Sequence, residues 1–185
     1  MILPIAIYGH PVLRKKAVDI DKDYPELDKL IEDMFETMYH SDGVGLAAPQ
    51  INKSIRLFVI DASPYAEEEP DLKDFKKVFI NAQIVERSDE MQSFNEGCLS
   101  LPGIREDVKR HLEIRMQYYD ENFEFHDEVF KGTPAVIIQH EYDHTDGILF
   151  IDRISPLRKR LIRSKLKALE DGRVSVKYKI IRNKK

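Results

Sequence analysis

Apolar side chains recur at helical spacing between residues 25 and 40 of the chain. They return every three or four residues, and this spacing places them on one face of an α-helix. Pro25 suits the first turn of such a helix. We therefore predict an amphipathic helix that packs on the core through this face. Its apolar positions are Leu27, Leu30, Ile31, Met34, Phe35 and Met38.

Runs of β-branched and aromatic residues follow farther along the chain. Residues 56–62, 77–87 and 111–130 are rich in Val, Ile, Phe and Tyr, which favour strands. The last run contains a turn signal at Asp120–Asn122, so it predicts an antiparallel hairpin. Residues 63–76 hold two prolines and five acidic groups, a composition typical of a solvated surface loop.

A second helix is predicted from its end signals. Thr133 supplies an N-cap residue and Pro134 suits the first helical position. The helix should run to about Thr145, because Gly147 stands where helices commonly end. A third helix is expected from about Pro156 to Leu169. Together the elements favour an α+β fold, in which antiparallel sheets pack around the central, motif-bearing helix and a further helix lies near the C-terminus.

The composition limits the class of protein. The chain has 185 residues, 42% hydrophobic and 34% charged, which suits a single catalytic domain over residues 1–185. Its apolar runs are too short to span a bilayer, and a net charge of −4 argues against a surface built for nucleic acid. The single cysteine forms no internal disulfide, and the N-terminal charges follow the apolar residues, the wrong order for a signal peptide. We expect a cytoplasmic protein.

The central helix carries the pattern H-E-x-x-H in His140-Glu141-Tyr142-Asp143-His144. Histidines four residues apart lie one turn apart on one helix face, so both imidazoles can reach one metal ion. Glu141 lies beside the first histidine, where it can act as general base. The alternative is a polar helix face with two unrelated histidines.

The third metal ligand has several candidates. A metzincin would place a histidine at position 150, but Phe150 cannot bind metal. Glu170 is a distant acidic candidate in a charge-rich tail. Cysteine is a residue type that is often simply buried in the core. However, a Cys98 thiolate together with two histidines would leave a fourth metal position for water, as catalytic sites require. The Cys98–His140–His144 set is therefore the stronger interpretation.

A third segment, Gly43-Val44-Gly45-Leu46-Ala47-Ala48-Pro49-Gln50, is rich in small residues. Glycines let another chain approach the backbone closely. The Gln50 amide can donate to a developing oxyanion. Alone, such a stretch is more often an ordinary turn, and it lacks the ending of a P-loop.

Together, GVGLAAPQ, EGCLS and QHEYDH resemble the three signature motifs of the peptide deformylases, in the family's order, within a similarity from His10 to Arg153. The resemblance implies that Cys98, His140 and His144 bind the metal and that Glu141 handles the proton. It also implies that Gln50 and the backbone N–H of Leu99 meet the oxyanion. Ferrous iron is the metal implied, with zinc, nickel or cobalt as replacements.

The resemblance implies a metal-dependent hydrolase of a linear amide bond that acts in N-terminal processing during protein biosynthesis. It would remove the N-formyl group from the initiator formyl-methionine of new polypeptides and release formate. Metal-bound water would attack the formyl carbon, with Glu141 as general base and then acid. The alternatives are a zincin-type metallopeptidase and a catalytically silent binding protein with this fold. Thr145 departs from the usual leucine, and the 63–76 segment is longer than usual.

Two further groups of residues bear on selectivity and support. Val136 and Ile137 precede His140 by four and three residues, so with Val44 they are expected to line a slot for methionine. The Gly45 backbone is expected to pair with an extended substrate. Glu96 is expected to pair with an arginine such as Arg105 and hold the cysteine loop.

The expected partners are N-formyl-methionyl nascent peptides, with no membrane and no sequence-specific nucleic acid. Seven basic residues and no acidic one lie between Arg153 and Lys167. Such a stretch is most often a solvated helix face, but it can also dock on a phosphate-rich partner such as the ribosome.

Overall fold

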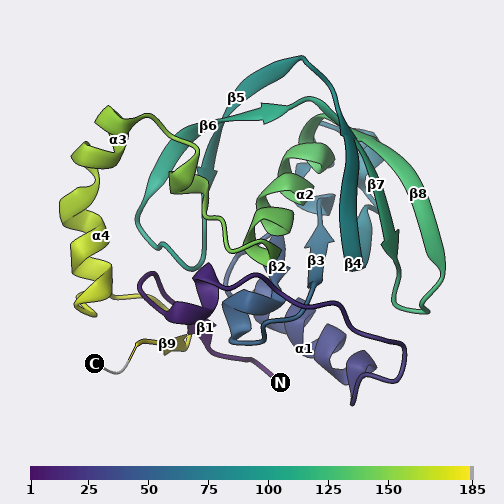
Figure 1. Ribbon diagram of the computed structural model, residues 1–185, viewed down its shortest axis with the longest axis horizontal. Helices are drawn as coiled ribbons and strands as arrows, with labels where there is room; N and C mark the ends of the chain where they lie inside the picture. The colour runs from purple at the N-terminus through teal and green to yellow at the C-terminus, as the bar shows by residue number, and fades with distance from the viewer. Residues whose placement is uncertain (184–185) are drawn as a thin grey trace.

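The computed structural model describes residues 1–183. Its largest element is a five-stranded antiparallel sheet (Figure 1). The predicted α+β class is confirmed, and the runs 56–62, 77–87 and 111–130 contain four of the five strands. In spatial order the strands are β2 (Gly45–Ala47), β3 (Leu57–Asp61), β4 (Lys76–Arg87), β7 (Glu113–Tyr119) and β8 (Phe125–Lys131).

A helix covers each face of this sheet. Side chains of a strand alternate between the two faces, and β3 shows the consequence. Leu57 and Val59 pack with α1 (Leu27–His40), whereas Phe58 and Ile60 pack with α2 (Gly132–Thr145). Because both faces of β3 are buried, its sequence is a continuous apolar run instead of an alternating one.

A second, two-stranded sheet lies over α2 and was not predicted (Figure 1). It consists of β5 (Met91–Gly97) and β6 (Arg105–His111), paired antiparallel. The buried positions of β6 are Glu106, Val108 and Arg110. Since two of these three side chains are charged, the hairpin carries no apolar alternation that sequence analysis can detect.

The N-terminal and C-terminal segments meet beside this hairpin. β1 (Ile5–Ala6) pairs with β9 (Ile180–Ile181), and this pair is parallel, whereas only antiparallel sheets were expected. The predicted third helix is divided at Ile162 into α3 (Pro156–Leu161) and α4 (Arg163–Glu170). Among the described residues, no helix is long and apolar enough to cross a membrane.

Three local predictions need correction. Helix α2 begins at Gly132, so its N-cap is Lys131 and not Thr133, whose hydroxyl donates a hydrogen bond to Glu69 instead. The 63–76 segment is not simply a solvated loop. It forms two short 3₁₀ turns, Ser63–Tyr65 and Pro70–Leu72, and buries Leu72. The first helix begins at Leu27, so Pro25 lies just outside it.

Candidate metal centre

Three potential metal ligands converge at the inner face of α2. Cys98 follows the last residue of β5, while His140 and His144 lie one turn apart on α2. One ligand atom of each residue lies within 4.8 Å of the other two, and Cys98 Sγ is 3.3 Å from His144 Nε2. A metal bonded at about 2.3 Å to sulfur and about 2.0–2.1 Å to nitrogen requires such crowding. One thiolate and two imidazoles therefore fit a divalent transition metal.

The two histidines have opposite electrostatic environments. Burial opposes protonation of His140, but hydrogen bonds with Cys98 and Glu96 outweigh it and hold the pKa of His140 well above its ordinary range. Burial, followed by the positive charges of His140 and Arg110, holds the pKa of His144 well below that range. His144 is thus neutral without a metal, whereas His140 would give up its proton on metal binding, because only a neutral imidazole is a ligand.

A buried chain of charges supports His140 from behind. Glu96 Oε2 lies 2.9 Å from His140 Nδ1, which leaves the other ring nitrogen to face the ligand cluster. Arg110 donates two hydrogen bonds to Glu96, at 2.7 and 2.8 Å, and a third to Asp143 at 2.6 Å. Burial alone would raise the pKa of Glu96, but the hydrogen bonds from Arg110 and His140 lower it to about 2. Glu96 is therefore a carboxylate held in one orientation.

The expected pair of Glu96 with Arg105 is wrong. Arg105 donates to the side chain of Asn95 at 2.8 Å, and Arg110 takes its place beside Glu96. Arg105 and Arg110 are five residues apart on β6, so they point to opposite faces of the strand. Only the inward-facing arginine can reach the buried glutamate.

Glu141 lies beside the ligand cluster and is buried. Burial raises the pKa of its carboxyl to about 7, and Oε2 has no hydrogen-bond partner among the described residues. A Cβ atom at Gly45 would lie 2.4 Å from Oε1 of Glu141, so glycine at position 45 leaves the room that this carboxyl occupies. A carboxyl in this environment can take up and release a proton near neutral pH.

Two N–H groups face the same region. Gln50 Oε1 accepts a hydrogen bond from Ala47 N–H at 2.8 Å, which turns Nε2 toward Cys98 Sγ at 3.5 Å and Ser100 Oγ at 3.3 Å. The backbone N–H of Leu99 donates no hydrogen bond within the part of the chain that the structure describes. The Leu99 N–H is thus free to donate to a ligand, whereas the Gln50 amide already donates to Cys98 and Ser100.

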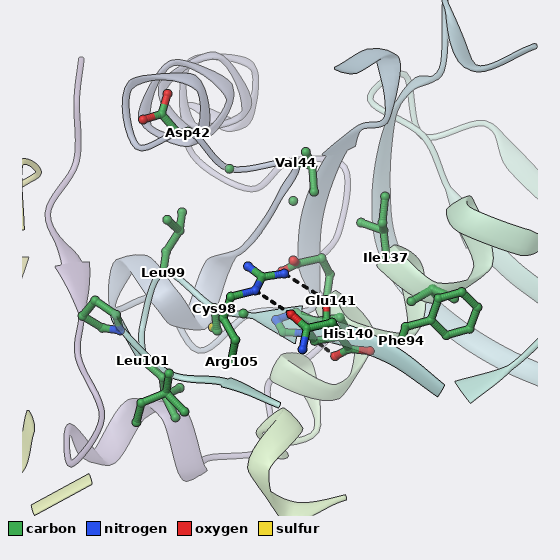
Figure 2. Close-up of a pocket in the computed structure, with 18 of the residues that line it drawn as sticks. Asp42, Val44, Phe94, Cys98, Leu99, Leu101, Arg105, Ile137, His140 and Glu141 are labelled. Carbon is green, nitrogen blue, oxygen red and sulfur yellow. Dashed lines mark hydrogen bonds and ion pairs between the residues drawn. The ribbon is translucent and has the colours of Figure 1, made fainter. Parts of the chain in front are cut away.

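A cavity of about 590 Å³ opens over these residues. Figure 2 shows Cys98, His140 and Glu141 close together, with Leu99 on one side and Ile137 on the other. The predicted slot residues Val44, Val136 and Ile137 all line the cavity, and so does Gly45. The structure therefore brings every predicted site residue to one place.

Other sequence candidates lie outside the ligand set. Phe150 packs its ring on His140, with ring centroids 5.9 Å apart, and Glu170 packs against Gly9. Sequence analysis missed Arg110 and Asp143, because their role depends on β6 crossing α2. It also missed two tyrosines of the cavity wall, Tyr65 and Tyr178, which come from segments with no apolar periodicity.

Comparisons with known proteins agree with this geometry. The family model for polypeptide deformylase matches residues 2–160. The chain is 54% identical to the peptide deformylase of Christiangramia forsetii, with 97% of this chain and 95% of the relative covered. It is 52% identical to that of Flavobacterium johnsoniae, at the same coverages.

Solved structures give the same result. A peptide deformylase from Plasmodium falciparum superposes with a TM-score of 0.82 at 38% identity, covering 91% of this chain and 95% of that chain. A peptide deformylase from Legionella pneumophila gives a TM-score of 0.81 at 36% identity, covering 94% and 98%. The similarity thus extends over nearly the whole fold.

Proposed function

The chain belongs to the polypeptide deformylase family, and we propose that Cys98, His140 and His144 are its metal ligands and Glu141 its proton carrier. The enzyme is a metal-dependent hydrolase that removes the N-formyl group from nascent peptides. The observation that supports the residue roles is the convergence of one thiol and two imidazoles within 4.8 Å of one another, beside a buried carboxyl.

Glu141 carries the proton in this proposal. A divalent metal held by Cys98, His140 and His144 would supply Lewis-acid chemistry that makes water a nucleophile near neutral pH. Glu141 accepts a proton from the attacking water and delivers it to the nitrogen of the leaving amine. The C–N bond of the formyl amide breaks, and formate and a free N-terminus are released. A carboxyl with a pKa of about 7 suits both halves of this transfer, because efficient proton carriers titrate near the working pH.

Gln50 and Leu99 stabilise the charge that develops on the formyl oxygen. The Gln50 side chain is oriented by Ala47, and the Leu99 amide is free of other acceptors among the described residues. The Leu99 donor needs no reorganisation to meet an oxyanion, whereas Gln50 exchanges its long hydrogen bond to Cys98 for one to the oxyanion.

The cavity wall selects the substrate. Val44, Val136 and Ile137 line it and offer an apolar slot for the unbranched methionine side chain. Gly45 belongs to β2, the edge strand of the main sheet. An edge strand can accept an extended peptide as an additional strand, and we propose that the nascent chain binds Gly45 in this way.

The finer assignments rest on chemistry. We propose ferrous iron as the metal, with zinc, nickel or cobalt as alternatives, since a thiolate and two imidazoles suit each ion. The lone cysteine, Cys98, suits the cytoplasm, where thiols stay reduced. We further propose that residues 1–185 act as a single catalytic domain.

The proposed ribosome contact rests on part of the basic stretch. Four of its seven residues make ion pairs: Arg153 with Asp143, Arg158 with Glu106, Lys159 with Asp152 and Lys167 with Asp171. Arg160, Arg163 and Lys165 remain for a phosphate-rich partner. Charge reversal of these three should abolish co-sedimentation with ribosomes, and unchanged co-sedimentation would remove the contact.

The activity is tested by formate release from a formyl-Met tripeptide, with the unformylated peptide as control. The protein is purified anaerobically and loaded with iron. Release should stop on chelation and return with Fe(II) or Ni(II). A folded, metal-loaded protein that releases no formate would overturn the proposed roles.

A further inference from the structure

The residue that offers the Leu99 amide lies in a tight turn. The N–H of Leu101 donates to the carbonyl of Cys98 at 2.9 Å, which closes a β-turn with Leu99 and Ser100 at its centre. The orientation of the central peptide distinguishes the common turn types, and the closing hydrogen bond alone does not fix it. The Leu99 N–H shares a peptide with the Cys98 carbonyl, so the closing bond holds that peptide. The next peptide, Leu99–Ser100, needs a contact from outside the turn to hold one orientation.

Two distant segments supply such contacts. The hydroxyl of Tyr178 donates to the Leu99 carbonyl at 2.7 Å. The N–H of Tyr8 donates to the Ser100 carbonyl at 2.8 Å. Both carbonyls at the centre of the turn are thus held by residues 79 and 92 positions away in the sequence.

The paired strands β1 and β9 hold these two tyrosines in place. Tyr8 lies two residues after β1, and Tyr178 lies two residues before β9. The N–H of Ile5 donates to the carbonyl of Lys179, the neighbour of Tyr178, at 2.9 Å. Figure 1 shows β1 and β9 side by side. The small parallel sheet thus fixes the backbone next to Tyr178.

Tyr178 is also close to the reaction. It lines the cavity together with Leu99 and Gln50. Burial, followed by the charge of Cys98, raises the pKa of Tyr178 to about 12, so its phenol keeps the proton that it donates. The turn that Tyr178 holds contains Ser100, whose Oγ accepts a hydrogen bond from Gln50. The Tyr178 hydroxyl therefore contacts Leu99 directly and is linked to Gln50 through the turn that contains Ser100.

We propose that Tyr178 is a positioning residue of this enzyme, whose hydroxyl holds the Leu99 carbonyl while Leu101 holds the Cys98 carbonyl, so that the Leu99 backbone is fixed on both sides and its N–H keeps one orientation at the cavity. This inference rests on the proposed role of Leu99 as an oxyanion donor. The hydrogen of this hydroxyl is donated within the protein, so Tyr178 has none to donate to the substrate. The segment before β9 thereby becomes part of the catalytic apparatus.

The test is Tyr178→Phe in the full, metal-loaded chain, with Tyr119→Phe as matched control. The hydroxyl of Tyr119 makes no hydrogen bond among the described residues, and its ring packs on Phe123. Loss of an oxyanion donor lowers kcat by 10²–10³ and misplacement costs part of that, so kcat of Tyr178→Phe should fall about 10-fold. KM for a formyl-Met tripeptide should stay within about two-fold, since the substrate contacts are intact. Metal content should equal that of wild type.

A second measurement does not depend on activity. In the zinc-loaded, ¹⁵N-labelled protein, the amide signals of Leu99 and Ser100 should broaden or shift in Tyr178→Phe and stay unchanged in Tyr119→Phe. Unchanged kcat, unchanged amide signals, or a raised KM with wild-type kcat would each overturn the inference. Failure of wild type and control alike to release formate would instead overturn the proposed function.

Discussion

Strand β3 and the β5–β6 hairpin both pack against α2, yet different interactions hold them. Four of the five residues of β3 are apolar and fully buried. The hairpin instead buries Glu96, Glu106 and Arg110, each in an ion pair. Apolar burial holds β3 whatever its precise neighbours are, whereas a buried charge is tolerated only beside its partner. The hairpin thus serves a particular geometry, that of His140.

The two regions also differ in how much the sequence could predict. The β3 run was predicted because apolar continuity is a local property of the sequence. The His140–His144 pair was predicted for the same reason, since helix periodicity alone places both rings on one face. Arg110 was missed because its partners, Glu96 and Asp143, lie on other elements, and no sequence spacing relates them. The same holds for Tyr178, which reaches Leu99 only because β9 pairs with β1.

Among these variants, removal of the buried arginine of the β5–β6 hairpin should have the largest effect on stability. Arg110→Ala removes the one buried cation that pairs with both Glu96 and Asp143, and leaves them only His140 and the half-exposed Arg153 as partners. We expect the free energy of unfolding to fall by about 3–5 kcal/mol, measured by urea denaturation.

The matched control is Arg153→Ala. Arg153 pairs with the same Asp143, but its side chain is 40% exposed, so its loss should cost less than about 1 kcal/mol. Equal losses in the two variants would contradict the importance of burial for the hairpin.

In β3, Leu57→Ala should lower the free energy of unfolding by about 3 kcal/mol, because Leu57 is fully buried and its truncation leaves a cavity between the sheet and α1. The metal affinity of the folded fraction should not change. Competition with a chromophoric chelator measures this affinity. A lower metal affinity in this variant would show that the packing of β3 also determines the geometry of the metal site.

Glu96→Gln tests whether the buried charge of the hairpin supports the metal site. The amide keeps the size of the side chain and removes the charge that orients His140, so metal affinity should fall about 10–100-fold. Asp107→Asn makes the same chemical change at an exposed position of the hairpin and should leave the affinity unaltered. Equal affinities in wild type and Glu96→Gln would mean that Glu96 does not support the metal.

The separation of metal binding from proton transfer is tested most directly by Glu141→Ala. Metal content and formate release are measured on the same samples of this variant and of wild type. Since a general base contributes about 10²–10⁴ to the rate, the variant should keep one metal per chain and lose nearly all turnover. An alanine variant that releases formate at close to the wild-type rate would contradict the assignment of Glu141 as the proton carrier.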